Sequence, residues 1–355
     1  MLNSSNGWRT EKVSRLLVSL RSGTATSADR KVAGEFAVYG ASGEIGRTDF
    51  PQEQGPCLLI GRVGSIGALN KIQNEFFWAS DNTLILKTNS HHVNFDFFFY
   101  AMKIFDFNLI RSGMGQPLIT GGALRNQRIL LPSLETQHRI VDFLDKETAR
   151  IDTLVDEMET MVTLLQEERK ALISETVKQE GKMEKVSRLL SSLSSGSASA
   201  SDRKSEGLFS IYGANGEIGR TNQPTDQGPC LLIGRVGSVG ALNKIEKEHF
   251  QASDNVLIAK VNHRIVFHFF VYAMEAFDFD IIKTGMGHPL ITGSALKNQR
   301  IPLPSLETQY KIVKFLNYET RRIDNAILQA KNVMTLLKEE RKVLINDVVT
   351  GKLEV

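Results

Sequence analysis

The chain has 355 residues, of which 41% are hydrophobic and 23% charged, and it carries a formal net charge of +3 with a pI near 8.7. This composition is ordinary for globular proteins of two or three domains, and no run reaches the ~18 apolar residues that a membrane helix needs. The start, "MLNSSNGWRTEKVS", lacks the apolar stretch of a secretory signal, so we expect a cytoplasmic protein.

The dominant feature of the sequence is a tandem duplication. "GPCLLIGRVGSIGALNKI" begins at Gly55 and returns at Gly228 with a single difference, Ile66 against Val239. "EKVSRLL" at Glu11 returns at Glu184, and "LPSLETQ" at Leu131 returns at Leu303. A repeat of this length and fidelity predicts two copies of one structural unit.

The first part of each repeat, residues 1–132 and 181–304, consists of short apolar runs separated by Gly, Asn, Asp and Pro. Runs such as "CLLI", "TLILK" and "VLIAK" are typical of short strands joined by exposed loops. The aromatic-rich segments 95–107 and 267–279 are more helical at their C-terminal ends, and we expect their rings to pack in a core. We therefore predict a mixed α/β domain in each copy.

The second part of each repeat, residues 133–180 and 305–355, is predicted to be a long helix. Ser133 is the expected N-cap, with Glu135 in the first turn, and neither Gly nor Pro follows until Gly181. Apolar residues recur every seven positions in both segments: Leu144, Ile151, Met158, Leu165 and Leu172 in the first, and Leu316, Ile323, Ala330, Leu337 and Leu344 in the second.

Two helices with matching heptads in one chain are expected to pack as a coiled coil. Antiparallel pairing would relate the two repeats by a pseudo-two-fold axis, whereas parallel pairing would force the chain to double back. The predicted fold class is thus two near-identical α/β (α+β) domains joined by an antiparallel coiled coil. The charged sequence "EERK", at 167–170 and 339–342, is interpreted as a solvated stripe on that coil.

Basic residues are concentrated in the two domains. Residues 1–132 hold 14 Lys and Arg against 10 Asp and Glu, and residues 181–304 hold 14 against 11, whereas residues 133–180 hold 6 against 12. This distribution favours binding domains on a non-binding spacer, although an ordinary solvated surface would look similar. Cys57 and Cys230 occupy the same place in the two apolar "CLLI" runs, and we expect both to be small buried side chains.

Several segments of the sequence resemble those of a known family. The helical segment beginning "LPSLETQHRIVDFLDKETARIDTL" and the terminal "RKVLINDVVTGKLEV" are similar to the conserved region of type I restriction-modification specificity subunits. The loops "YGASGEIGRT", "CLLIGRVGSIGAL", "ASDN" and "SGMGQPLIT" resemble one type of their target recognition domain. The resemblance covers nearly the whole chain, in both copies and in the same order.

The resemblance implies a non-catalytic subunit that binds double-stranded DNA. In this family each recognition domain reads half of a bipartite site, and the coil sets the gap. Two methyltransferase subunits and restriction endonuclease/translocase subunits are the implied partners, and S-adenosylmethionine, ATP and Mg are expected on them, with no cofactor in this chain and no membrane. Because the two domains are near copies, we expect similar half-sites in inverted orientation, and divergence by a base or so if Ser42/Asn215, Trp78/Gln251, Gln116/His288 or Gly122/Ser294 reach the bases.

The glycine-rich loop "GRVGSIG" is the sharpest candidate for binding. Its glycines allow backbone amides to approach a phosphate, and Arg is a frequent partner of guanine. A tight structural turn with a solvated Arg is the alternative. The candidates here are Arg62, Ser65, Asn70 and Lys71, with Arg235, Ser238, Asn243 and Lys244 in the second copy.

Two further loops supply the remaining candidates. "YGASGEIGRT" offers Tyr39, Ser42 and Arg47, matched by Tyr212, Asn215 and Arg220, and "SGMGQPL" offers Gln116, matched by His288. Each is also compatible with a plain surface turn. "ASDN", at 79–82 and 252–255, is interpreted as a turn whose polar groups hold the loop.

Three classes of function are compared. A DNA specificity subunit is favoured; a nucleotide-using enzyme is disfavoured, because the sequence contains no methyltransferase "NPPY" motif, no G-x-x-x-x-G-K-[ST] loop and no HExxH. A coiled-coil scaffold with protein-binding heads is the third. Steep weakening of duplex DNA binding by salt separates the first from the third.

Overall fold

A computed structural model describes residues 7–113, 115–178, 181–285 and 287–355. The chain forms two compact units: unit 1 comprises residues 1–157 and 333–355, and unit 2 comprises residues 158–332. The first six residues of the predicted 1–132 domain and the last two of the predicted 133–180 helix lie outside the described residues.

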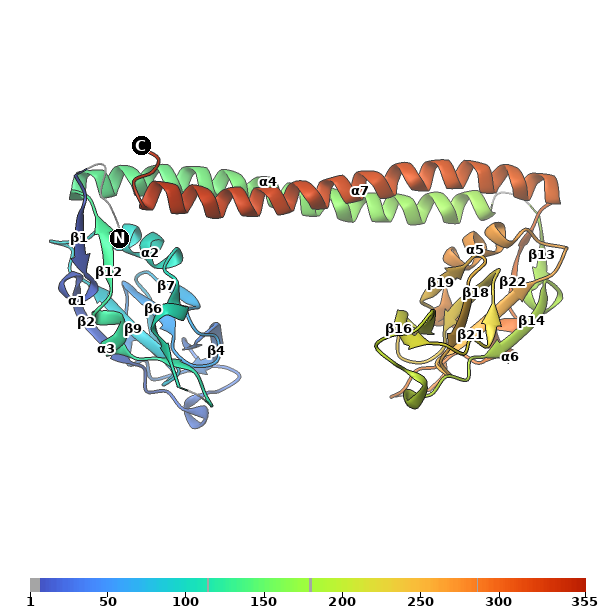
Figure 1. The fold of residues 1–355 in the computed structure, drawn as a ribbon, viewed down its shortest axis with the longest axis horizontal. Coiled ribbons are helices and arrows are strands. Elements are labelled where there is room, and N and C mark those ends of the chain that lie inside the picture. The colour runs from blue at the N-terminus through green and yellow to red at the C-terminus, as the bar shows by residue number, and fades with distance from the viewer. Residues whose placement is uncertain (1–6, 114, 179–180, 286) are drawn as a thin grey trace. The chain divides into compact units, whose positions relative to one another are not determined.

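Unit 1 contains the first mixed α/β domain (Figure 1). Its elements are β1 (Arg9–Lys12), α1 (Val13–Leu16), β2 (Leu17–Ser22), β3 (Phe36–Gly40), β4 (Gly43–Thr48), β5 (Glu53–Gln54), β6 (Cys57–Gly61), β7 (Leu69–Ile72), β8 (Phe76–Ala79), β9 (Thr83–Thr88), α2 (Phe95–Lys103), β10 (Arg111–Ser112), β11 (Leu118–Ile119), α3 (Gly121–Arg125), β12 (Arg128–Leu131) and the first half of α4 (Leu134–Lys178).

Unit 2 repeats this order with small changes. Its elements are β13 (Lys182–Lys185), β14 (Leu190–Ser195), β15 (Phe209–Gly213), β16 (Gly216–Thr221), β17 (Asp226–Gln227), β18 (Cys230–Gly234), β19 (Leu242–Ile245), β20 (His249–Ala252), β21 (Val256–Val261), α5 (Phe267–Glu275), α6 (Gly293–Lys297), β22 (Arg300–Leu303) and most of α7 (Leu306–Val349). Short 3-10 turns follow β1, β2 and α2 or their equivalents: Ser27–Asp29, Phe107–Ile110, Val186–Arg188, Ala200–Asp202 and Phe279–Ile282.

Two four-stranded sheets lie face to face in each domain. In unit 1 the antiparallel sheet β2-β9-β6-β7 packs between helix α2 and the second sheet, β4-β3-β8-β5, in which β3 and β8 run parallel. Strand β6 is buried on both faces because its side chains alternate: Leu58 and Ile60 belong to the core under α2, whereas Cys57 and Leu59 pack against Phe77 between the sheets. Unit 2 has the same strand orders.

Both cysteines are buried and unpaired, as predicted. Burial raises the pKa of Cys57 and of Cys230 to about 12, so both thiols stay protonated at neutral pH. They are packing residues of the space between the sheets.

The long helices begin as the sequence predicts. The amide of Thr136 donates to Ser133 Oγ (3.2 Å), and the amide of Thr308 donates to Ser305 Oγ (3.2 Å), which caps both helices. The fully buried Gln137 also ties the start of α4 to α2, because its Oε1 accepts from the amide of Asn94 (2.8 Å). The domain and its helix are therefore joined by hydrogen bonds at the first turn.

In each unit α4 and α7 pack antiparallel, which confirms the predicted direction (Figure 1). In unit 1, Leu144 shares a core with Ile345 and Val348, and further along α4 the carboxylate of Asp152 meets Arg341. In unit 2 the core joins Ile173 and Val177 of α4 to Ile312, Val313 and Leu316 of α7. Of the ten predicted heptad positions, five are buried and five are half-buried: the buried ones are Leu144, Ile151, Leu316, Ile323 and Ala330, and the half-buried ones are Met158, Leu165, Leu172, Leu337 and Leu344.

The interpretation of "EERK" as a solvated stripe is wrong for its arginines. The side chains of Arg169 and Arg341 are only 30% and 26% exposed, and each forms an ion pair with an aspartate of the other long helix. A long side chain at the edge of an apolar seam can bury its stem and still reach a partner across the seam, which periodicity in one helix does not reveal.

We expect Leu144→Ala to lower the free energy of unfolding of unit 1 by about 2–5 kcal/mol, because it removes a fully buried side chain from the core that joins α4 to the domain. The two tryptophans, Trp8 and Trp78, both lie in unit 1, so their fluorescence during urea unfolding reports that unit.

The matched control is Leu316→Ala in unit 2. It should shift the unfolding followed by circular dichroism while leaving the tryptophan midpoint in place. An unchanged tryptophan midpoint in Leu144→Ala would contradict the packing of α4 into unit 1.

Candidate nucleic-acid interface

Four loops meet at one place in each domain, and together they are called the loop cluster. In unit 1 it consists of residues 41–42, 61–67, 80–82 and 111–119; in unit 2 it consists of 214–215, 234–240, 253–255 and 283–291. Met114 in "SGMG" and Met286 in the corresponding "TGMG" lie outside the described residues. The glycine-rich loop is the centre of each cluster.

Backbone hydrogen bonds hold the loop cluster together. The amide of Arg62 donates to the carbonyl of Asn82 (2.9 Å), and the carbonyl of Arg62 accepts from the amide of Ile119 (2.9 Å). In unit 2 Arg235 makes the same two bonds, to Asn255 and Ile291, at the same distances. The predicted loops "CLLIGRVGSIGAL", "ASDN" and "SGMGQPLIT" are therefore neighbours in space.

Two glycines of the central loop are required by close approach. A Cβ at Gly61 would lie 2.1 Å from the carbonyl oxygen of Ser65 and 3.0 Å from Cβ of Ala41, so this position brings the loop against the β3–β4 turn. Gly67 has φ +78°, and a Cβ there would lie 2.7 Å from the ring of Phe107. Their substitution would displace the loop.

Several backbone amides of the central loop already donate hydrogen bonds within the domain. Those of Gly61, Arg62, Ile66 and Gly67 donate to backbone carbonyls within the domain. The segment between them, 63–65, is joined to the hairpin by the antiparallel bridge between Val63 and Leu118, and its Ser65 is exposed.

The guanidinium of Arg62 lies at the end of β2, where Nη1 donates to Ser22 Oγ (3.0 Å). Arg235 makes the equivalent bond to Ser195 Oγ (3.3 Å). Among the described residues nothing accepts a hydrogen bond from the buried Nε of either arginine. A half-buried guanidinium with unused donors stands beside the central loop in both units.

Three other predicted residues belong to the same place. Ser42 is exposed at the tip of the β3–β4 turn, and Gln116 is exposed on the hairpin; their counterparts Asn215 and His288 are exposed as well. Asn70 supports the turn, because its Nδ2 donates to the carbonyl of Ala41 (3.2 Å). In unit 2 Asn243 donates likewise to Ala214 (3.2 Å).

Lys71 and Lys244 are directed away from the loop cluster. Side chains alternate along a strand, so Lys71 lies on the opposite face of β7 from Asn70. It pairs with Asp96 of α2 (2.7 Å). Lys244 pairs with Glu246 (2.8 Å), and the hydrogen bond from Lys244 lowers the pKa of that carboxyl.

Tyr39 and Arg47 also have partners within the domain. The Tyr39 ring packs edge-on against Phe77 and its hydroxyl donates to Glu75 Oε1 (3.1 Å); burial, reinforced by Glu75, raises the Tyr39 pKa to about 12. Tyr212 packs in the same way against Phe250. Arg47 donates to the carbonyls of Gly34 and Glu35, and Arg220 donates to Glu217.

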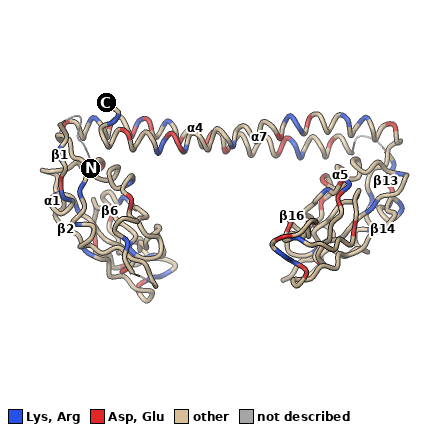
Figure 2. The backbone as a smooth tube through the Cα atoms, in the orientation of Figure 1, with Lys and Arg blue, Asp and Glu red and all other residues tan. Residues whose placement is uncertain are grey.

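Sequence reasoning missed several exposed basic residues near these elements. Arg111 and its counterpart Lys283 begin the hairpin of the loop cluster, and Arg30 and Arg203 contact Gly46 and Gly219 beside Arg47 and Arg220. The repeated "DRK" at 29–31 and 202–204 was the available signal. Figure 2 shows basic and acidic residues interspersed along the backbone of each domain.

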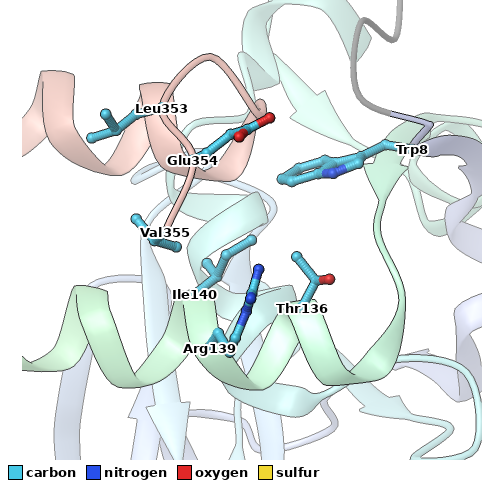
Figure 3. Close-up of a pocket in the computed structure, with 7 residues that line it drawn as sticks. All are labelled: Trp8, Thr136, Arg139, Ile140, Leu353, Glu354 and Val355. Atoms are coloured by element: carbon cyan, nitrogen blue, oxygen red, sulfur yellow. The ribbon is translucent and has the colours of Figure 1, made fainter.

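A groove at the first turns of each long helix is a second duplicated feature. In unit 1 it encloses about 460 Å³ and is lined by Thr136, Arg139 and Ile140, opposite Trp8 and the C-terminal residues 353–355 (Figure 3). In unit 2 the equivalent residues Thr308, Lys311 and Ile312 line a groove of about 470 Å³. No helix among the described residues is long and apolar enough to cross a membrane.

Comparison with known proteins now identifies the family. The model of the type I restriction modification DNA specificity domain matches residues 7–158 and again 168–332. The chain belongs to this family. Both copies of this DNA specificity domain contain one complete loop cluster.

Individual relatives are more distant. The chain is 27% identical over 122 residues to the type I restriction enzyme EcoprrI specificity subunit of Escherichia coli, a match that spans 34% of this chain and only 29% of that protein. A solved chain from work on complex assembly and conformational transition of the type I R-M system has a TM-score of 0.74 at 17% identity, covering 99% of this chain and all of that one.

The HsdS subunit from Thermoanaerobacter tengcongensis has a TM-score of 0.56 at 16% identity, with 99% of this chain and 100% of that chain covered. At such identities these likenesses show the fold alone.

Proposed function

We propose that the chain is the DNA specificity subunit of a type I restriction-modification complex, and that each domain reads one half of a bipartite site in double-stranded DNA. The supporting observation is that a matching DNA specificity domain occurs twice, each time with the same four-loop cluster. It would act in the cytoplasm, where a bacterial cell keeps its DNA. The domains would comprise residues 1–132 and 181–304, with 133–180 and 305–355 as helical spacers.

The loop cluster is the proposed DNA-binding surface. Ser42, Arg62, Ser65 and Gln116, with Asn215, Arg235, Ser238 and His288 in unit 2, would contact DNA directly. Arg and Gln are suited to bidentate contacts with guanine and adenine, and serine hydroxyls and loop amides to phosphates. Asn70 and Asn243 would act by holding the β3–β4 turn and its equivalent.

Tyr39, Arg47 and Lys71, with Tyr212, Arg220 and Lys244, are weaker candidates, because each except Tyr212 has a polar or charged partner within its own unit, and Tyr212 is held by packing. A contact with DNA would first require those interactions to open, which costs part of the energy gained. We assign these six residues to the support of the domain.

The two half-sites are proposed to be similar and inverted. The backbone bonds of the two clusters match atom for atom at the central loop, so both domains would approach DNA in the same way. Differences between the halves would come from exposed side chains such as Ser42/Asn215 and Gln116/His288. Gln116 presents an amide and His288 a ring nitrogen. The two half-sites would therefore differ in sequence at the base pair that this position contacts.

The helix pair is proposed to set the gap between half-sites. Helices α4 and α7 each contribute to both units, so residues inserted into both would lengthen the connection without altering either loop cluster. The two grooves share one wall of three equivalent residues at the helix starts, although their opposite walls differ, and they are proposed to receive two copies of one partner, the methyltransferase subunit. The endonuclease subunits, S-adenosylmethionine, ATP and Mg would belong to the assembled complex, and this chain would be non-catalytic.

The proposal is tested by selection of bound duplexes from a randomised DNA library with the purified chain or its complex with the methyltransferase. We expect a motif of two similar half-sites in inverted orientation, separated by a constant gap. Affinity for the selected duplex should fall steeply with salt, because phosphate contacts release counterions. Two unrelated half-sites would contradict the inverted arrangement, and salt-independent or absent duplex binding would favour the protein-binding scaffold.

Arg62→Ala combined with Arg235→Ala should weaken binding to the selected duplex by about 1–3 kcal/mol for each lost contact. Fluorescence anisotropy with labelled duplex measures the loss. The matched control is Arg15→Ala with Arg188→Ala, which removes the same charge from equivalent exposed positions held by Glu11 and Glu184 outside the loop cluster. Equal effects of the two pairs would remove Arg62 and Arg235 from the interface.

Insertion of three heptads into both long helices, after Thr160 and after Asn332, should lengthen the gap of the selected motif. These positions lie between the ion pairs Asp152–Arg341 and Arg169–Asp324, so the contacts within each unit stay in register. The added length is about 32 Å at ~1.5 Å per residue, close to one turn of DNA, so we expect a gap about nine base pairs longer. An unaltered gap would refute the role of the helix pair as a spacer.

A further inference from the structure

The joint between each domain and the long helices is built from the same parts in both units. In unit 1 the hydroxyl of Tyr100, near the end of α2, bonds to side chains of α4, and Arg341 of α7 pairs with Asp152 of α4. In unit 2 Tyr272 of α5 bonds to α7, and Arg169 of α4 pairs with Asp324 of α7. The joint is thus a duplicated contact of three helices.

Two positions of this joint differ in charge between the units. Lys103, at the end of α2, corresponds to Glu275 at the end of α5, and Asp145 of α4 corresponds to Asn317 of α7. Several neighbouring residues also differ, among them Phe99 against Val271 and Lys146 against Tyr318, so only direct exchange of these four residues separates their effect from that of the neighbours.

In unit 2 one arginine connects all three helices. Arg169 donates from Nη1 to Glu275 Oε2 (2.9 Å) and from Nε to Asp324 Oδ1 (3.0 Å). The neighbouring contact is neutral, with the Tyr272 hydroxyl donating to Asn317 Oδ1 (2.8 Å). Of the two carboxylates that contact Arg169, Glu275 thus belongs to the domain and Asp324 to the long helix.

In unit 1 both carboxylates of the joint, Asp145 and Asp152, belong to the long helix α4. Arg341 directs Nε (2.8 Å) and Nη2 (3.0 Å) to the carboxylate of Asp152 alone. At the place of Glu275 stands Lys103, whose ammonium lies 4.8 Å from the centre of the Phe99 ring. The Tyr100 hydroxyl donates to the carboxylate of Asp145 (2.6 Å), and burial together with this bond raises the Tyr100 pKa to about 12.

The two differences compensate each other. Unit 1 has two cations, Lys103 and Arg341, and two carboxylates, whereas unit 2 has one cation and two carboxylates with a neutral amide at Asn317. A glutamate at 103 beside Asp145 would gather three carboxylates around one arginine. A lysine at 275 beside Asn317 would leave two cations with one carboxylate. Counted over these residues, the net charge is 0 in unit 1 and -1 in unit 2, and each single exchange shifts it by two, to -2 or to +1, in a half-buried joint.

We propose that this joint is a charge-matched socket, in which Asp145 accepts the domain that carries Lys103 and Asn317 accepts the domain that carries Glu275. Each long helix would thus accept a domain according to the charge of one residue, a lysine for α4 and a glutamate for α7. The inference does not depend on DNA binding. It matters because "LPSLETQ", identical in both copies, lies between the two halves of each matched pair. A domain exchanged at that sequence would arrive without the helix residue that matches it.

The test is a pair of full-length chimaeras in which residues 186–302 replace 13–130, with both seams in sequence common to the two copies. One chimaera keeps Asp145 and the other carries D145N, which supplies the match for the incoming glutamate. Trp8 remains in unit 1 and reports its unfolding in urea. We expect a higher unfolding midpoint for the matched chimaera, and the difference should shrink in 1 M salt, where the Debye length falls to about 3 Å.

Point variants of the native chain supply the second measurement. K103E and D145N should each lower the unit 1 midpoint, and the double variant K103E/D145N should recover part of the loss, since it recreates the set found in unit 2. Equal midpoints for the two chimaeras, a difference insensitive to salt, or strictly additive point variants would each overturn the proposal.

Discussion

The structure depends on the antiparallel packing of α4 against α7. Each domain core is completed by a helix from the other repeat: Ile345, Val348 and Val349 of α7 lie in the core of unit 1, and Ile173 and Val177 of α4 lie in the core of unit 2. The apolar surface of each domain is therefore covered in part by a helix of the other repeat.

This packing explains how the same two helices stabilise both domain cores and also connect the two units. The start of each long helix is tied to its own domain by a capping serine and by buried Gln137 or Gln309, while its far end enters the core of the other unit. Each long helix is therefore anchored in a core near both of its ends. The proposed gap between half-sites would owe its constancy to that coupling.

The loop cluster uses backbone contacts for its architecture and leaves exposed side chains to vary. Arg62 and Arg235 make their main-chain bonds at equal distances, although the exposed tips differ as Ser42 against Asn215 and Gln116 against His288. Loops positioned through their own backbone tolerate such replacements because the scaffold does not depend on the side chains. The same fold can therefore present two slightly different exposed surfaces.

Periodicity, repeats and turn residues were enough to determine the two α/β domains, the long capped helices, their antiparallel pairing and the buried cysteines, because these features depend on local spacing and on matching apolar patterns. The same reasoning brought Arg62, Ser65 and Asn70 together on one loop, but it also included Lys71, which the pleat of β7 turns toward α2. Only the tertiary structure showed that Arg169 and Arg341 bridge α4 and α7 and that the Tyr100 hydroxyl donates to Asp145. Such contacts join residues far apart in sequence, and a charge at one position acquires its meaning only when the folded chain brings its partner within a few ångströms.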